Sequence, residues 1–155
     1  MLGVLITPLS RGNVTIKSTD TSDLLIINPN WLSDPADQEV TVAIFKRMRQ
    51  AFQSKAMVPV IIGEEYFLGP HVQSDSDFLE FIKNNLMILW HAGFTDKIGM
   101  LYDEMAVVDA FCRVYNVHGL HVVDASAFPF LPPGHPQSTV YMLAEKIFDA
   151  LVRGS

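Results

Sequence analysis

The chain has 155 residues, nearly half of them hydrophobic, and a formal net charge of -6. This length and hydrophobic content are enough for one domain with a buried core, so we predict a single domain over residues 1–155. The acidic balance argues against nucleic acid as a partner, because phosphate backbones are bound by clustered Lys and Arg.

The single cysteine, Cys112, excludes an internal disulfide and favours a reducing, cytoplasmic location. The apolar start at residues 1–6 is short, has no basic segment and is ended by Pro8, so it does not predict a signal peptide. No apolar run approaches the length of a membrane span, and we expect no membrane partner. The positive mean hydropathy therefore indicates a buried core or an apolar surface that binds a partner.

Short β-prone runs dominate the first part of the chain. Residues 3–7 and 13–18 flank the turn-like sequence PLSRG, and this arrangement predicts a β-hairpin. The apolar run 24–27 predicts a third strand or an extended segment. Further short β-prone runs lie at 107–108 and 114–115, and residues 120–123 have the pattern of a buried strand.

Three longer segments have helical spacing of apolar residues. The first begins at Asp34, a good N-cap followed by Pro35, and runs to about Ser54. The second begins at Ser74 or Asp75 and runs to Trp90-His91, and the third runs from Ser138 or Thr139 to about Val152. Their predicted inward residues are Val40, Ile44, Phe45, Met48 and Phe52, then Phe78, Leu79, Ile82, Leu86 and Leu89, then Val140, Leu143, Ile147 and Leu151. The predicted fold is therefore α+β, with a small antiparallel or mixed sheet and three long helices.

Most of the residues with chemical potential have an ordinary structural interpretation. His71, His118 and His121 lie in or beside turns, where surface or packing roles are expected. No pair of residues has the His-x-x-x-His or Cys-x-x-Cys spacing of a metal site, so we expect no metal. Cys112 has no activating neighbour in the sequence and is expected to be a buried thiol.

Two histidines have a more specific context. His91 closes a long apolar segment, and His135 lies in a loop framed by Pro and Gly just before a helix. Imidazole gains or loses a proton near neutral pH, so two such rings facing one pocket suit acid–base catalysis. The alternative is that each histidine caps a helix end.

Several segments, in chain order and with the right spacing, match motifs of one enzyme family. The matches are SRGNV at 10–14 with SRG.V, INPNWLSDPAD at 27–37 with I.P.yL..p.D, WHAGFTDKIG at 90–99 with H..GTc.MG, AVVD at 106–109 and VYNVHGLHVVDAS at 114–126 with aVVD…rVyGv.gLrVvDaS, and PGHPQSTVYMLAEK at 133–146 with H/N-P…aEk. The chain resembles the C-terminal, substrate-domain part of the glucose-methanol-choline (GMC) flavin oxidoreductases, and is closest to fungal members.

This resemblance implies roles for particular residues. In the family, the motif histidine and the later His or Asn flank the reacting carbon above the flavin, and His91 and His135 stand at these positions. The positions that resemble flavin-facing ones are Asp124, Ala125, Gln137 and Thr139. Substrate contacts are expected from Trp90, Phe94, Phe130 and Gln137.

The departures from the family pattern concern the cofactor. No G-x-G-x-x-G, the element that holds the FAD pyrophosphate, is present in this sequence. Phe94 replaces a motif glycine, Asp96 a cysteine, Ile98 a methionine and His121 an arginine. We therefore expect a truncated GMC region that lacks the dinucleotide-binding segment and binds no cofactor.

A region that has lost the half against which it packs would expose apolar surface, so we expect a homodimer. The main hypothesis is a flavin-free, non-redox enzyme of natural-product biosynthesis. It would act as a cyclase, isomerase, lyase, dehydratase or pericyclase on an apolar small molecule, with His91 and His135 as acid and base.

Two alternatives stay open at this stage. The chain is half of a split FAD-dependent alcohol oxidoreductase whose FAD-binding part is a separate polypeptide, or it is a non-catalytic binding remnant. Turnover without flavin, a yellow complex with a partner, or indifference to mutation of both histidines distinguishes these hypotheses.

Overall fold

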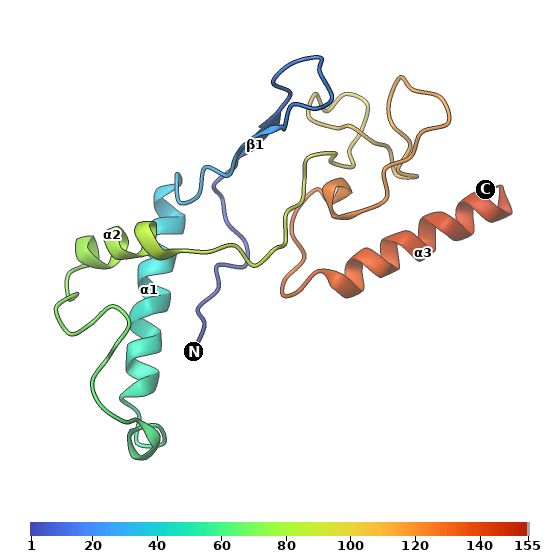
Figure 1. Ribbon diagram of the computed structural model, residues 1–155. Coiled ribbons are helices and arrows are strands. Elements are labelled where there is room, and N and C mark those ends of the chain that lie inside the picture. Colours follow the sequence, from blue (N-terminus) through green and yellow to red (C-terminus); the bar gives the residue numbers. More distant parts are fainter. Residues whose placement is uncertain (155) are drawn as a thin grey trace. The chain divides into compact units, whose positions relative to one another are not determined.

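The computed structural model describes residues 1–154 and divides into two compact units, an N-terminal unit (Met1–Met87) and a C-terminal unit from Ile88 onward. The elements in chain order are β1 (Asn13–Thr15), β2 (Ile26–Asn28), α1 (Pro35–Phe52), the 3-10 turn η1 (Val58–Val60), α2 (Asp75–Asn85), the 3-10 turn η2 (Ala125–Ala127) and α3 (Gln137–Arg153) (Figure 1). These helices and the small sheet confirm the predicted α+β class. The single domain over 1–155 stays a prediction.

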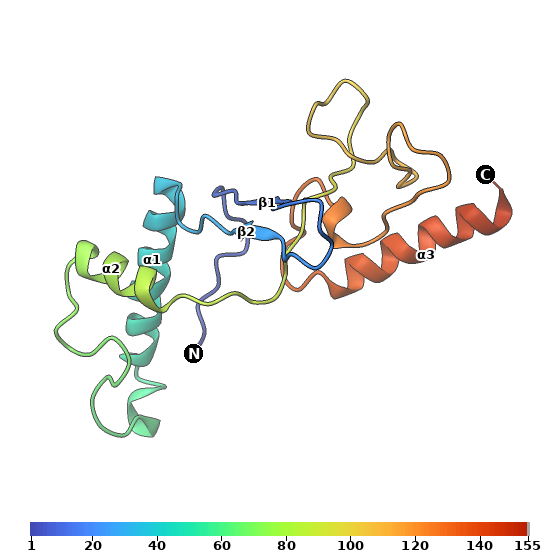
Figure 2. The same cartoon turned by 45° about the horizontal axis from the view of Figure 1, so that its top comes forward.

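The sheet of the N-terminal unit is a two-stranded antiparallel ladder of β1 and β2 (Figure 2), and in its register Val14 lies opposite Ile27. The predicted hairpin between residues 3–7 and 13–18 is therefore wrong, because β1 pairs with the later apolar run. The turn is longer than predicted and is closed by polar contacts, in which Lys17 and Ser18 both bind the carboxylate of Asp23. For the apolar run 24–27, the sequence left open a strand or an extended segment, and the structure forms the strand β2 there.

Helix α1 begins as the sequence predicts. The side chain of Asp34 accepts the backbone N–H of Ala36, and Pro35 occupies the first helical position. The buried residue of the apolar face is Val42, whereas the predicted Val40 is exposed. Helix α2 begins with a capping box between Ser74 and Asp77, also near the predicted start.

The predicted C-terminal end of the second helix is wrong. Helix α2 ends at Asn85, and Leu86 has an extended backbone with ψ 150°, so Trp90 and His91 lie outside it. The core of the N-terminal unit comprises Leu32, Val42, Phe78 and Ile82. Leu79 and Leu86 pack at its edge, which agrees with the predicted inward stripe of α2.

The C-terminal unit consists of helix α3 and long loops that form a second core. The buried residues of this core are Val108, Cys112, Ala127 and Ile147. The predicted strands of this region occur only as isolated bridges, between Val108 and both Ile98 and Val114 and between Arg113 and His121. Helix α3 begins at Gln137, one residue before the predicted start, and its predicted inward residue Leu151 is exposed.

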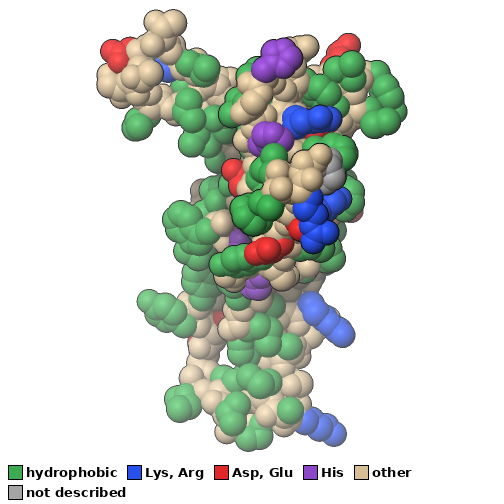
Figure 3. Space-filling model, turned by 90° about the vertical axis from the view of Figure 1, so that its right-hand side faces the viewer, with side chains coloured by type: hydrophobic (Ala, Val, Ile, Leu, Met, Phe, Trp, Pro, Cys, Tyr) green, Lys and Arg blue, Asp and Glu red, His purple; other side chains and the backbone are tan. Residues whose placement is uncertain are grey.

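Many large hydrophobic side chains are exposed, as the green surface in Figure 3 shows. Both strands of the ladder are exposed along their whole length, and so are Ile62 and Tyr66 after η1. The sequence led us to expect exposed apolar surface, whereas the homodimer expected to cover it stays a prediction. Among residues 1–154, no helix combines the length and apolarity needed to cross a membrane.

Candidate functional site

His91 and His135 meet in the C-terminal unit, although 44 positions separate them in the chain. Nε2 of His91 lies 2.7 Å from Nδ1 of His135, which is a hydrogen bond. The two rings are nearly perpendicular, at 76°, with centroids 5.0 Å apart. Neither histidine caps a helix, so the structure favours the paired arrangement over the capping alternative.

The loop that carries His91 is held against the η2 turn. The backbone N–H groups of Phe94, Asp96 and Ile98 donate in succession to the carbonyl oxygens of residues 125, 126 and 127, at 3.4, 3.0 and 2.8 Å. A Cβ on Gly93 would lie 2.9 Å from the carbonyl oxygen of Ala125, so a glycine is required at this close approach. These three hydrogen bonds, which we call the loop–η2 ladder, fix the path of the chain directly after His91.

Asp124 fixes the other side of this ladder. Its carboxylate accepts the backbone N–H of Ser126 at 2.7 Å and the Ser126 hydroxyl at 2.5 Å, and so caps η2. The sequence suggested a flavin-facing role for Asp124 and did not identify this cap. An Asp two residues before a Ser is a common turn pattern, so the signal was present in the sequence.

His135 is placed by the start of α3. Gly134 takes a left-handed backbone with φ 86°, and Pro136 follows as the N-cap residue of the helix. The helix is anchored by Ile147, which is almost fully buried against Val108, Cys112 and Ala127. The second core therefore supports both histidines, through η2 for His91 and through α3 for His135.

The other predicted site residues are less closely arranged. Trp90 and Phe130 are 85% and 67% exposed, Phe94 is half-buried, and Gln137 is exposed at the first position of α3. Among residues 1–154, no hydrogen bond or ring contact joins Trp90, Phe130 or Gln137 to either histidine. Their predicted role in substrate binding stays a prediction.

The backbone on both sides of His91 is left-handed at residues other than glycine. Trp90 has φ 61° and Phe94 has φ 75°. Bulky side chains rarely adopt this conformation, and strain of this kind concentrates at functional sites. The value at Phe94 also explains the glycine in the family motif, because glycine takes this conformation without strain.

The remaining histidines agree with their structural interpretation. His71 and His118 are exposed, and the ring of His121 contacts the carbonyl oxygen of Phe111 at 3.1 Å. Cys112 is fully buried, and this burial raises the pKa of its thiol, as does the nearby Asp109. Among residues 1–154, no three potential ligands gather in a way that could hold a metal ion.

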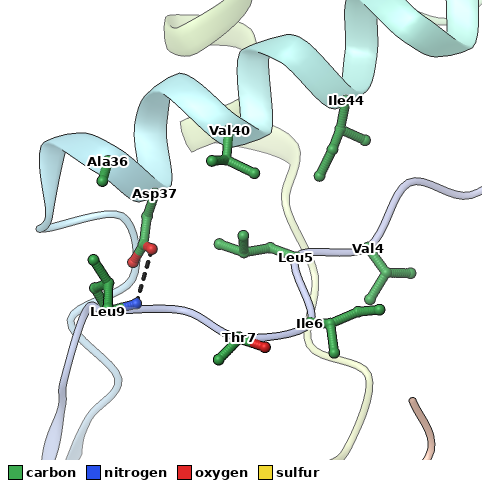
Figure 4. Close-up of a pocket in the computed structure, with 9 residues that line it drawn as sticks. All are labelled: Val4, Leu5, Ile6, Thr7, Leu9, Ala36, Asp37, Val40 and Ile44. Atoms are coloured by element: carbon green, nitrogen blue, oxygen red, sulfur yellow. Dashed lines mark hydrogen bonds between the residues drawn. The ribbon is translucent and has the colours of Figure 1, made fainter. Parts of the chain in front are cut away.

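The N-terminal unit contains an apolar pocket of about 450 Å³ between the first residues of the chain and α1 (Figure 4). Val40 and Ile44 point from the helix toward Leu5, and Asp37 reaches the backbone of Leu9. The pocket holds neither histidine. The charged residue that lines it, Asp37, already accepts the backbone N–H groups of Leu9 and Ser10 and the hydroxyl of Ser10.

The residues near the histidine pair fit only part of a flavin cofactor. The first N–H groups of α3, at Gln137, Ser138 and Thr139, have no intrahelical acceptor and suit the oxygen-bearing edge of a flavin ring. The carboxylate of Asp124 is bound to Ser126, so residues 124–125 offer backbone groups. No G-x-G-x-x-G is present for the pyrophosphate.

Comparison with protein families gives one match over most of the chain. The family model described as GMC oxidoreductase matches residues 8–144. This span contains both histidines, the η2 turn and the first part of α3.

Individual relatives share much of the sequence. Patulin synthase of Penicillium expansum is 53% identical over 143 residues, which cover 92% of this chain and 23% of the relative. Versicolorin B synthase of Aspergillus parasiticus is 44% identical over 154 residues, which cover 99% of this chain and 24% of the relative. The chain spans about a quarter of the length of the curated relatives that it matches.

Solved structures show the same fold. An FAD-dependent oxidoreductase from Chaetomium thermophilum superposes with a TM-score of 0.88 at 30% identity, covering 96% of this chain and 26% of the other. A fungal aryl-alcohol oxidase gives a TM-score of 0.81 at 26% identity, covering 97% of this chain and 24% of the other.

Proposed function

The chain belongs to the GMC oxidoreductase family, and on this premise we propose that its His91–His135 pair catalyses a redox-neutral proton transfer on an apolar small molecule of natural-product biosynthesis. The reaction class is cyclisation, isomerisation or dehydration. The observation that supports it is the 2.7 Å hydrogen bond between the two imidazoles. Relatives named as synthases of patulin and of versicolorin B support the substrate class.

The hydrogen bond determines how protons are distributed over the pair. Two neutral imidazoles carry two N–H groups, and one of these must lie between Nε2 of His91 and Nδ1 of His135. If His91 donates, its Nδ1 has a free lone pair and His135 carries its own single N–H hydrogen on Nε2. If His135 donates, these roles are reversed. In either state, one outer nitrogen is a base and the other is an acid.

This complementarity permits a complete proton relay. The basic outer nitrogen takes the proton of a substrate hydroxyl or C–H group, and the shared hydrogen crosses to the other ring. The acidic outer nitrogen then gives its proton to a carbonyl or leaving oxygen of the substrate. One proton enters and one leaves, so no electron acceptor is required and the pair ends with its two roles exchanged.

Alcohol oxidation is the second candidate function, because the matching solved structures include an FAD-dependent oxidoreductase and an aryl-alcohol oxidase. In that case an FAD-binding part of GMC type would accompany this region, and the first backbone N–H groups of α3, at Gln137, Ser138 and Thr139, would help to hold the flavin. Bound FAD would supply the hydride acceptor. The histidine pair would still take the hydroxyl proton, so the same residues serve both candidates.

The experiment that tests the proposal is turnover of apolar hydroxy-ketones by the purified chain under nitrogen, without added flavin. The expected product has the mass of the substrate, or that mass less water, and mass spectrometry with NMR identifies it. His91→Ala and His135→Ala should each reduce the rate by about 10²-fold or more. His71→Ala, an exposed histidine in the other unit, is the matched control and should leave the rate unchanged.

Each outcome of this experiment favours one candidate. Turnover that requires added FAD, or that yields a product two hydrogens lighter, would replace the redox-neutral proposal with alcohol oxidation. Turnover that survives loss of both histidines would remove the pair from either mechanism.

A further inference from the structure

The strand β1 contains a motif that the histidine site does not use. Asn13-Val14-Thr15 has the form Asn-x-Ser/Thr, with a residue other than proline in the middle, which is the acceptor sequence for N-linked glycosylation. No other asparagine of this sequence is followed two positions later by Ser or Thr. Because so short a motif also occurs by chance, its position in the structure decides whether it can carry a glycan.

Asn13 and Thr15 are accessible together. Successive residues of a strand point to opposite faces, so these two side chains lie on the same face of β1, and both residues are exposed. Among residues 1–154, neither side chain makes a hydrogen bond, whereas Asn28 accepts the backbone N–H of Asn30 at 3.1 Å and Asn30 donates to the carbonyl oxygen of Arg11 at 2.9 Å. The carboxamide and the hydroxyl of the motif are therefore both open to an approaching transferase.

The two faces of the β1–β2 ladder differ in polarity. One face comprises Asn13, Thr15, Asn28 and Ile26, and the other comprises Val14 and Ile27. The apolar pair of Val14 and Ile27 is exposed and suits contact with other protein. The motif lies on the opposite, more polar face, where a bulky and hydrated glycan would stay in water. Glycosylation of Asn13 is therefore compatible with protein that covers the apolar face.

We infer that Asn13 is the attachment site of an N-linked glycan. In the transfer, Nδ2 of the Asn13 carboxamide forms a bond to the anomeric carbon of an oligosaccharide carried on a polyprenyl pyrophosphate. The bond from that carbon to the pyrophosphate breaks, the pyrophosphate leaves with the bonding electrons, and the nitrogen loses one proton. Nothing is oxidised or reduced, and this inference is independent of the reaction proposed for the histidine pair.

A glycan on Asn13 assigns the chain to the secretory pathway, where this modification is made. The sequence led us instead to expect a cytoplasmic location, because Cys112 is the single cysteine. Cys112 is fully buried, and a buried thiol is inert even in an oxidising compartment. The two locations make opposite predictions for the mass of a peptide that contains Asn13.

The test is the mass of the tryptic peptide 12–17 from the native protein, isolated from the cells that produce it. Cleavage after Arg11 and after Lys17 releases this peptide with the motif intact. The peptide should be found mainly in glycosylated form, and peptide-N-glycosidase should convert its asparagine to aspartate. Peptide 18–46, which contains Asn28 and Asn30, is the internal control and should be unmodified.

Variants expressed in the same cells separate this motif from other attachment sites. Asn13→Gln and Thr15→Ala should each lose the oligosaccharide mass completely, whereas Thr15→Ser keeps a hydroxyl and should retain most of it. Asn28→Gln is the matched control, because Asn28 is exposed and lies opposite Asn13 in the β1–β2 ladder but has no such motif, and it should be glycosylated like the wild type. An unmodified peptide 12–17 in the native protein, or an oligosaccharide mass that persists in Asn13→Gln, would overturn the inference.

Discussion

The carboxylate of Asp124 accepts two hydrogen bonds from Ser126, one from the Ser126 backbone N–H at 2.7 Å and one from the Ser126 hydroxyl at 2.5 Å. The turn closed by this contact presents the carbonyl oxygens that bind the loop after His91. Asp124 is thus a positioning residue for the histidine pair, although it touches neither ring.

Replacing Asp124 by Ala should remove the cap and lower the free energy of unfolding by about 1 kcal/mol. The amides of Asp96 and Ile98, which donate to this turn, should then exchange with deuterium faster, as NMR or mass spectrometry can measure. Asp124→Asn should retain most of the stability, since Asn is also a good capping residue. Equal exchange rates in Asp124→Ala and the wild type would show that the ladder does not depend on the cap.

The sequence predicts the beginnings of the helices well, because local chemistry determines them. Asp34 with Pro35, and Ser74 with Asp77, cap their helices through contacts within three residues, so no distant part of the chain is needed. The end of α2 was missed because the apolar residues after Asn85 continue a helical pattern in an extended segment. Periodicity alone does not distinguish these two states.

The strands and the site geometry depend on distant contacts, which the sequence shows less clearly. β1 pairs with β2 across a long loop, and the β-prone runs near Val108 form only single bridges. The motif resemblance selected His91 and His135, whereas the direct bond between them became visible only in three dimensions. The left-handed backbone of Phe94 was likewise invisible, although the glycine expected at that position hinted at it.

Asp37 is a buried carboxylate that joins the start of the chain to α1. It is 3% exposed and accepts the backbone N–H groups of Leu9 and Ser10 as well as the Ser10 hydroxyl. Burial by itself raises the pKa of Asp37, but these hydrogen bonds and the charge of Arg11 outweigh it and hold the pKa below the ordinary value of 3.8.

Replacing Asp37 by Asn should lower the free energy of unfolding at pH 7 by about 1–3 kcal/mol, because a buried acceptor is lost. The folded state depresses the pKa, so the ionised carboxylate stabilises the protein above pH 3.8 and this contribution disappears as the pH falls through the depressed value. Denaturant unfolding of both proteins between pH 7 and pH 2 should therefore show curves that converge at low pH. A difference that stays constant over this range would contradict the role of the charge. Asp34→Asn, which keeps a good cap, is the control and should change stability little at any pH.

Arg49 joins α1 to the loop that precedes α2. Its guanidinium group binds Glu65 at 2.8 Å and donates to the carbonyl oxygens of Val72 and Gly69 at 2.5 and 3.0 Å. It also lies 4.7 Å from the ring centroid of Phe78 in the core. One planar, multiply donating group therefore holds several parts of the N-terminal unit together.

Lysine cannot reproduce this arrangement, since it has a single ammonium group and no planar fork. Arg49→Lys should lower the free energy of unfolding by about 1–3 kcal/mol and speed hydrogen exchange over residues 65–72. Arg47→Lys is the matched control, because Arg47 lies on the exposed side of the same helix and donates only to Gln50 among the described residues. If both variants behave alike, general loss of an arginine rather than the network around Arg49 would explain the effect.

Cys112 gives a direct measure of how often the second core opens. It is the single thiol of the chain, is fully buried, and has its pKa raised chiefly by burial, so the native thiol is both inaccessible and protonated. Labelling by a disulfide reagent should therefore be slow in the folded protein and should follow the population of the open state.

Ile147, which packs in the same core, controls that population. Ile147→Ala should destabilise the core by about 2–5 kcal/mol and accelerate labelling at least about tenfold, and Ile147→Val by about 0.5–1.5 kcal/mol with a smaller effect. Leu151→Ala, at an exposed position of the same helix, should label at nearly the wild-type rate. Because this core supports both η2 and α3, acceleration in Ile147→Ala should be accompanied by loss of the His91–His135 hydrogen bond in imidazole nitrogen spectra, whereas a bond that survives rapid labelling would mean that the pair is held independently of this core.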